Sequence, residues 1–144
     1  MQTLAEARYA RWVRPLWPIE RAVLEATAHD YPAFADNIRR QAETAQVTEF
    51  ENSGAGFFST VSVTPDAPLL PDKLPLDGAY GSVEGIEHGM GFVVFLEGGR
   101  LSLIEGYCHG NVSTGGVDFS AVKFDVKPWS ASQSLCPLST HCGH

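Results

Sequence analysis

The residues best able to do chemistry lie in one stretch, from Glu87 to His109. Two strand-like runs in this stretch flank Gly98-Gly99, a dipeptide typical of two-residue hairpin turns. A regular register from that turn pairs Leu96 with Leu101, Val94 with Leu103, Phe92 with Glu105, Met90 with Tyr107 and His88 with His109. The leucines and Val94 make this the core face. We therefore expect Glu105, Tyr107, His88 and His109 to lie together at the end of this face that is farthest from the turn.

Glu105 is the first candidate, as a general acid or base. A carboxylate beside Phe92 and Tyr107 on an apolar face must be paired, hydrogen-bonded or protonated. The alternative is a structural buried acid, bonded to a helix arginine, to Tyr107 or to the main chain. Around this group we expect a ligand pocket that includes Tyr107, Phe92, Met90 and Glu84.

His88 and His109 are the second candidate, because two facing imidazoles can share a divalent metal ion or a proton. Glu105 lies about 13 Å along the strand from His109, too far for a common metal ion. Glu84 or Glu87 would be a better third ligand. The alternative is a pair of polar histidines without chemistry, and we predict no cofactor.

Several other chemistries are disfavoured by spacing. Cys108 would point away from His109, and the chain has no Gly-x-Ser-x-Gly nucleophile elbow. Gly54 and Gly56 lack the third glycine and the following helix of a dinucleotide site. The last residues include Cys136, His141, Cys142 and His144, whose spacing matches no zinc motif.

The elements that must position these residues change period near Val47. Earlier residues have helical spacing: a possible short helix over 3–14, one with Pro18 in its first turn, and one that Asp30 caps. Later residues alternate, which predicts strands over 47–52, 57–63, 80–86 and 117–126, together with the hairpin over 90–107. Four prolines in 64–77 predict a loop that covers a sheet edge or roofs a pocket.

This order of elements predicts an α+β fold, with N-terminal helices packed on one face of a five- to six-stranded antiparallel sheet. We expect residues 1–129 to form a single domain and the Ser-rich residues 130–144 to form a flexible tail.

Charge is distributed unevenly along the 144 residues. Residues 1–45 hold six basic and six acidic groups, whereas the rest hold four basic and eleven acidic groups and carry the whole net charge of −7. An acidic β half repels phosphate, which disfavours nucleic-acid binding. The sequence has no apolar run of about 18 residues and no secretion signal, so we expect no membrane span and a cytoplasmic location.

Three motifs carry a resemblance. G-A-G-F-F-S at 54–59, H-G-M-G-F-V-V-F at 88–95 and L-S-L-I-E-G-Y at 101–107 resemble the G-x-G-F-F-[ST], H-G-x-G-F and L-E-G-Y elements of a group of small uncharacterised bacterial proteins. The resemblance covers about residues 45–110. It implies an α+β fold and a bacterial source, and it transfers no activity.

Two functions fit these observations. One is a non-enzymatic binding or regulatory domain, such as a toxin-neutralising (immunity-type) protein, whose acidic β surface meets a basic protein partner. The other is a small acid–base or metal-dependent hydrolase that acts on a small molecule, with a pocket around Glu105 and His88 beneath the proline-rich loop. A homodimer through an exposed sheet face is compatible with either. A concave site at Glu105 favours the enzyme, and a flat one favours the binding domain.

Overall fold

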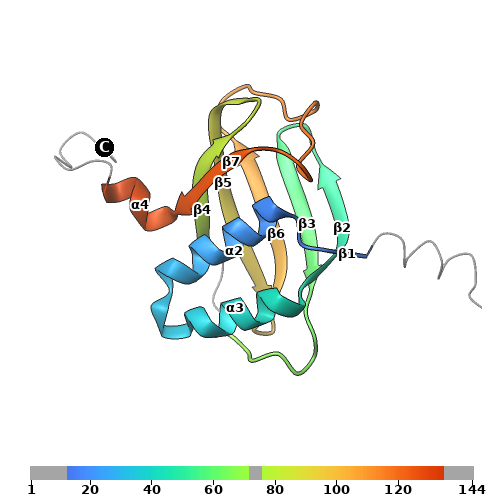
Figure 1. The fold of residues 1–144 in the computed structure, drawn as a ribbon, viewed down its shortest axis with the longest axis vertical. Coiled ribbons are helices and arrows are strands. Elements are labelled where there is room, and N and C mark those ends of the chain that lie inside the picture. Colours follow the sequence, from blue (N-terminus) through green and yellow to red (C-terminus); the bar gives the residue numbers. More distant parts are fainter. Residues whose placement is uncertain (1–12, 72–75, 135–144) are drawn as a thin grey trace, which may run out of the picture.

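A seven-stranded antiparallel sheet is the frame of this protein, in a computed structural model that describes residues 13–71 and 76–134. The strand order is β1-β2-β3-β6-β5-β4-β7 (Figure 1). The strands are β1 (Arg14–Pro15), β2 (Gln46–Asn52), β3 (Gly56–Ser62), β4 (Leu76–Val83), β5 (Ile86–Glu97), β6 (Arg100–Cys108) and β7 (Phe124–Pro128). The helical segments are α2 (Pro18–Asp30), the 3-10 turn η1 (Pro32–Phe34), α3 (Ala35–Thr44) and α4 (Trp129–Ser134).

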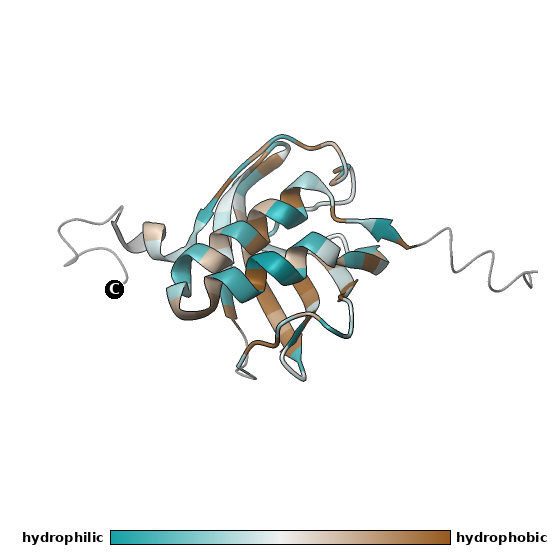
Figure 2. Ribbon diagram, turned by 60° about the horizontal axis from the view of Figure 1, so that its bottom comes forward, coloured by the Kyte–Doolittle hydropathy of each residue, from teal (hydrophilic) through white to brown (hydrophobic). Residues whose placement is uncertain are grey.

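Helices α2 and α3 lie across one face of the sheet, as the sequence predicts (Figure 1). Ile19 and Val23 of α2 and Ile38 of α3 are at most 1 % exposed and pack on the strands. Phe57 and Phe92 fill the centre of this core from the sheet side. The outward turns of both helices are mainly hydrophilic (Figure 2). The α+β prediction is therefore confirmed, with one strand more than the upper bound expected.

The hairpin of β5 and β6 turns where the sequence predicts, but its register differs. Gly98 and Gly99 have φ of +60° and +79°, as a two-residue turn with left-handed residues requires. Leu96 pairs with Leu101, and a bulge then makes Phe95 pair with Leu103. Every later pair is displaced by one residue, and this displacement moves side chains between the two faces of the sheet.

Other expectations need correction at the ends of elements. Asp30 ends α2 rather than capping the next helix, and α3 begins without a side-chain cap. The last strand is confined to β7, because residues 117–123 form turns and irregular segments. Residues 130–134 of the expected tail belong to α4, and its residues 135–144 lie outside the described residues. The expected helix over 3–14 also lies mostly outside them, with Arg14 in β1.

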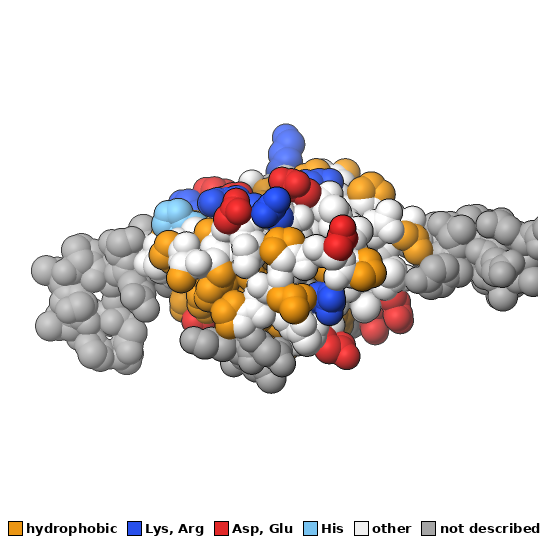
Figure 3. Space-filling model, turned by 90° about the horizontal axis from the view of Figure 1, so that it is seen from below, with side chains coloured by type: hydrophobic (Ala, Val, Ile, Leu, Met, Phe, Trp, Pro, Cys, Tyr) orange, Lys and Arg blue, Asp and Glu red, His pale blue; other side chains and the backbone are white. Residues whose placement is uncertain are grey.

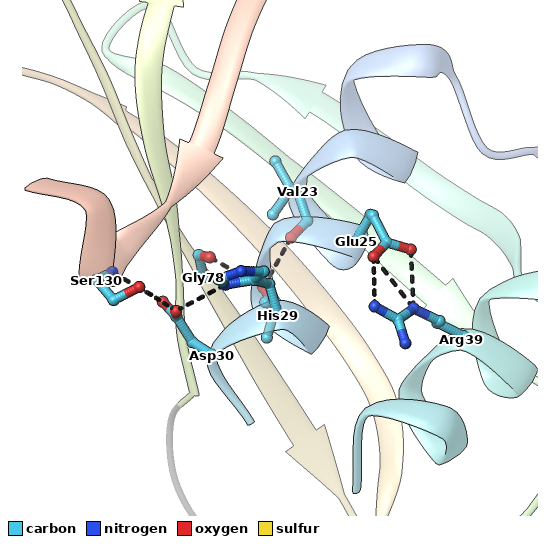
Figure 4. Close-up of polar contacts among 8 residues, drawn as sticks. Val23, Glu25, His29, Asp30, Arg39, Gly78 and Ser130 are labelled. Carbon is cyan, nitrogen blue, oxygen red and sulfur yellow. Dashed lines mark hydrogen bonds and ion pairs between the residues drawn. The ribbon is translucent and has the colours of Figure 1, made fainter. Parts of the chain in front are cut away.

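Asp30 has another role, at the start of α4. Its carboxylate accepts hydrogen bonds from the Ser130 backbone nitrogen, at 2.9 Å, and from Ser130 Oγ, at 2.5 Å (Figure 4). Free N–H groups at a helix start favour a carboxylate in this position. Partial burial raises the pKa of Asp30, but the hydrogen bonds from Ser130 and the neighbouring His29 outweigh it, so the pKa lies below its ordinary value.

This contact predicts that acid releases α4. A lowered pKa means that Asp30 contributes stability above its unfolded pKa of about 3.9, and that this contribution is lost as pH falls through the folded value. We expect lower protection of the amides in 129–134 from hydrogen exchange, relative to their intrinsic exchange rates at the same pH, below about pH 4. Asp30→Ala should show the same low protection at neutral pH, at a cost of about 1 kcal/mol. Asp36→Ala, an exposed acid on α3, is the control. Equal exchange in the two variants would contradict the prediction.

Candidate functional site

Helices α2 and α3 leave the opposite face of the sheet uncovered, and among the described residues α4 reaches its margin, where the Trp129 ring meets the Tyr80 ring edge-on at 6.3 Å. The middle of this opposite face is apolar and half-buried, whereas the residues that point to the helices are almost completely buried. We call this middle the open face, made by Phe58 and Thr60 of β3, Val93 and Phe95 of β5, and Leu103, Glu105 and Tyr107 of β6. Its strands are the central ones of the sheet, so the surface is broad and supported from behind by the core.

Glu105 is at the centre of the open face. It pairs with Phe58 on one side and with Val93 on the other, so it lies opposite the core face on which the sequence placed it. The bulge beside Phe95 is the physical reason for this correction. Among the described residues, no side chain or main-chain group forms a hydrogen bond or ion pair with the Glu105 carboxylate. Its oxygens are not among the described buried polar atoms that lack a hydrogen-bonding partner, so water can still reach the carboxylate.

A row of residues across five strands runs through this position. Directly paired residues in antiparallel strands point to the same face. The row therefore reads Glu51, Phe58, Glu105, Val93 and Asp77, from β2 to β4. Acids and apolar side chains alternate along it, with an exposed acid at each end.

Tyr107 forms the neighbouring row of the open face. Its ring lies over Gly91, where an added Cβ would come within 2.4 Å of the phenol oxygen. The ring also meets His109 edge-on, with centroids 5.7 Å apart. Gly91 thus provides the space for the Tyr107 ring on this surface. A glycine inside a strand often marks such a close approach, so Gly91 was the signal that the sequence offered.

His88 and His109 are not cross-strand partners, because the pairing of β5 with β6 ends at Met90 and Cys108. Both histidines line a hollow of ≈440 Å³ beside β7. His88 Nε2 lies 3.9 Å from Glu87 Oε1, and its side chain is 61 % exposed. No group of three potential ligands that could hold a metal ion occurs among the described residues. The hollow therefore brings the two histidines to one place without completing the predicted metal site.

The remaining predicted site residues are dispersed. Phe92 and Met90 are each 1 % exposed and belong to the core, although Met90 also borders the histidine hollow. Glu84 lines another hollow, of ≈500 Å³, with Gly85 and Asp118. Glu105 lines neither, so Glu105, His88 and Glu84 do not form one pocket.

The proline-rich loop packs at the opposite end of the hairpin from His88. Leu70 donates its backbone N–H to the Gly99 carbonyl, at 2.8 Å. Figure 3 views the molecule from this end, where apolar side chains gather below the charged side chains of the helices. The described part of the loop, up to Pro71, therefore covers the hairpin turn and does not roof a site at Glu105.

Cys108 offers no nucleophile. Burial raises the pKa of the Cys108 thiol, which keeps the group protonated near neutral pH. The thiolate is the reactive form of cysteine, so this position matches the ordinary behaviour of a partly buried thiol.

Comparison with protein-family models, with curated proteins and with solved structures finds no match. No described helix is long and apolar enough to cross a membrane. What the protein does must therefore be argued from the open face and its charges.

Proposed function

We propose that this protein is a non-enzymatic binding or regulatory domain that holds a basic protein partner on the open face. The observation that carries the proposal is Glu105, a half-buried carboxylate without a hydrogen-bonding partner among the described residues, at the centre of an apolar sheet surface. Toxin neutralisation is one function of this kind, since it requires only tight association with another protein.

The charges around the open face support a basic partner. Strand pairing places six acids on this side of the sheet and only two bases: Glu49, Glu51, Asp77, Glu97, Glu105 and Asp125, against Arg100 and Lys127. Both bases are at the margins of this side of the sheet. Arg100 donates to the Pro65 carbonyl at 2.9 Å, and Lys127 lies 3.5 Å from Asp125. The field over the middle is therefore acidic and would attract a basic surface.

The same charges disfavour a homodimer through this face. In a two-fold dimer the same patch meets itself, so an isologous contact would bring Glu105 and its flanking acids close to their own copies. Like charges in a desolvated contact oppose association. A partner of the opposite charge fits the surface better than a second copy does.

The hydrolase alternative has less support. Acid–base catalysis needs both groups within reach of one substrate, in a site that excludes water. Glu105 lies on a broad sheet surface, whereas His88 is exposed in a separate hollow beside β7. Glu105 lines neither hollow, which fits a contact surface better than an enclosed catalytic site.

The test compares three forms of the full chain as bait in an extract of the source organism: wild type, Glu105→Lys and Glu43→Lys. Glu43 is exposed on α3, on the other side of the molecule, and provides a matched charge reversal. Proteins that wild type and Glu43→Lys retain but Glu105→Lys loses are purified and titrated by calorimetry at low and high salt. Thermal unfolding first establishes that all three forms are folded.

We expect a basic protein that binds stoichiometrically, more weakly at high salt, and at least about 30-fold more weakly to Glu105→Lys. The proposal fails if no retained protein distinguishes Glu105→Lys from Glu43→Lys. It also fails if sedimentation shows that the wild-type chain forms a dimer that Glu105→Lys alone dissociates, because the open face would then be a self-contact.

A further inference from the structure

Resting on the proposed function, we infer that the partner contacts Glu105 with an arginine, whose guanidinium pairs with the carboxylate and stacks against the aromatic rings beside it. The inference concerns the chemistry of one contact, so it is narrower than the proposal that the open face binds a protein. It follows from a comparison of two glutamates in the same chain.

Glu20 shows what the protein does with a carboxylate among aromatic rings. Arg14 Nη1 and Nη2 each lie 2.9 Å from a Glu20 oxygen, in a bidentate ion pair. The guanidinium carbon of Arg14 also lies 3.4 Å from the centre of the Trp17 ring and 5.5 Å from that of Phe50. Glu20 is completely buried, and Arg14 provides both its counter-charge and its cover.

Glu105 has the same kind of surroundings without the arginine. Phe58 is its direct cross-strand neighbour, and Tyr107 follows two residues along the same strand on the same face. Such neighbours lie about 5 and 7 Å away, within reach of one planar cation that touches the carboxylate. Glu20 also accepts hydrogen bonds from the Trp17 backbone nitrogen and Ser59 Oγ, whereas Glu105 has all its acceptor positions free of described partners.

Arginine suits this position better than lysine for two physical reasons. A guanidinium offers two parallel N–H groups to a carboxylate and presents a flat face to an aromatic ring, whereas an ammonium is a compact point charge. A guanidinium is also more weakly hydrated, so less is lost when it enters a half-buried apolar surface. Glu51 and Asp77, at the ends of the acidic row, would draw the cation toward the centre before contact.

The experiment uses small cations as probes and needs no identified partner. Ethylguanidinium and ethylammonium chlorides are titrated into the isotope-labelled full chain, to about 0.2 M at constant ionic strength. NMR follows the Glu105 side-chain carboxyl carbon and the ring protons of Phe58 and Tyr107. The same titrations are made on Glu105→Gln and on Glu51→Gln, which removes an exposed acid from the same row.

We expect ethylguanidinium to give saturable shifts at all three side chains, with about two- to fivefold tighter binding than ethylammonium. Glu105→Gln should lose the saturable shifts, and Glu51→Gln should keep them. Equal affinity for the two cations, shifts that stay linear, or shifts that survive in Glu105→Gln would overturn the inference.

The two proposals fail in different ways. A retained protein that depends on Glu105, together with probes that do not discriminate guanidinium from ammonium, would remove the arginine and leave the binding function. Conversely, probes that bind as expected, with no retained protein sensitive to Glu105→Lys, would remove the binding function as proposed.

Discussion

Replacing Glu20 with alanine is expected to lower the free energy of unfolding by about 3–5 kcal/mol. Glu20 is completely buried, and its carboxylate accepts four hydrogen bonds: two from Arg14, one from the Trp17 backbone and one from Ser59. The variant leaves Ser59 buried without this partner and leaves the Arg14 guanidinium without a counter-charge. These bonds join the start of α2 to β1 and β3, so their loss loosens the helix from the sheet.

A second glutamate–arginine pair provides the control. Glu25 and Arg39 join α2 to α3 on the outer surface, with a shortest N–O distance of 2.7 Å (Figure 4). Their side chains are 60 % and 48 % exposed, so solvent screens the attraction. Glu25→Ala should therefore cost less than about 1 kcal/mol. Urea unfolding followed by circular dichroism measures both variants, and similar losses would show that burial of the Glu20 pair is not what stabilises it.

Replacing both buried partners separates the cost of an unpaired group from the worth of the pair. When two buried charges are exchanged for apolar residues of similar size, stability often changes little. Arg14→Met combined with Glu20→Leu should therefore be more stable than Glu20→Ala alone. The difference in unfolding free energy that remains between the double variant and wild type measures the hydrogen bonds that Ser59 and the Trp17 nitrogen lose. A double variant as unstable as Glu20→Ala would mean that these hydrogen bonds, not the unpaired arginine, account for the loss.

The β5–β6 hairpin shows which features a local sequence pattern can predict and which it cannot. Gly98-Gly99 predicts the turn correctly because a two-residue hairpin loop needs left-handed backbone at both of its positions, which glycine adopts most readily. The bulge escapes prediction because its extra residue, Ser102, lies in β6 among Leu101, Leu103 and Ile104, so the local pattern does not decide which of these apolar residues face the core. That one extra residue decides that Glu105 faces the open surface. The sequence therefore identifies Glu105 as a candidate site residue but assigns it to the wrong face of the sheet.

The helices show a different limit. Ile19 and Val23 recur at helical spacing and are buried, as their pattern predicts. Glu20 and Gln41 are each 0 % exposed, although charged and amide side chains in such helices are usually found on the outer surface. Glu20 has local partners in Arg14 and the Trp17 nitrogen, but Ser59 lies 39 residues away, and the Leu101 partner of Gln41 lies 60 residues away. No local pattern contains this information, because the fold creates it.

Substitution of Gln41 is the second change that we expect to lower the free energy of unfolding strongly. The Gln41 amide nitrogen donates to the carbonyls of Pro68, at 2.7 Å, and Gly99, at 3.0 Å. Its amide oxygen accepts from the Leu101 backbone nitrogen, at 2.8 Å. One side chain of α3 thus holds the proline-rich loop at Pro68 and the start of β6 at Gly99 and Leu101. Gln41→Met, which keeps the length of the side chain but forms none of these bonds, should cost about 2–4 kcal/mol.

Hydrogen exchange can show where that free energy is lost. The Leu70 amide should exchange faster in Gln41→Met, because its acceptor is the Gly99 carbonyl that Gln41 also holds. The Leu101 amide should exchange faster as well, since it loses its acceptor directly. Asn37→Ala is the control, because Asn37 gives the same loop a single exposed bond to Leu69, worth about 1 kcal/mol or less. If Gln41→Met were as stable as Asn37→Ala and both amides stayed protected, prolines and apolar contacts alone would hold the loop, and the buried amide would be dispensable.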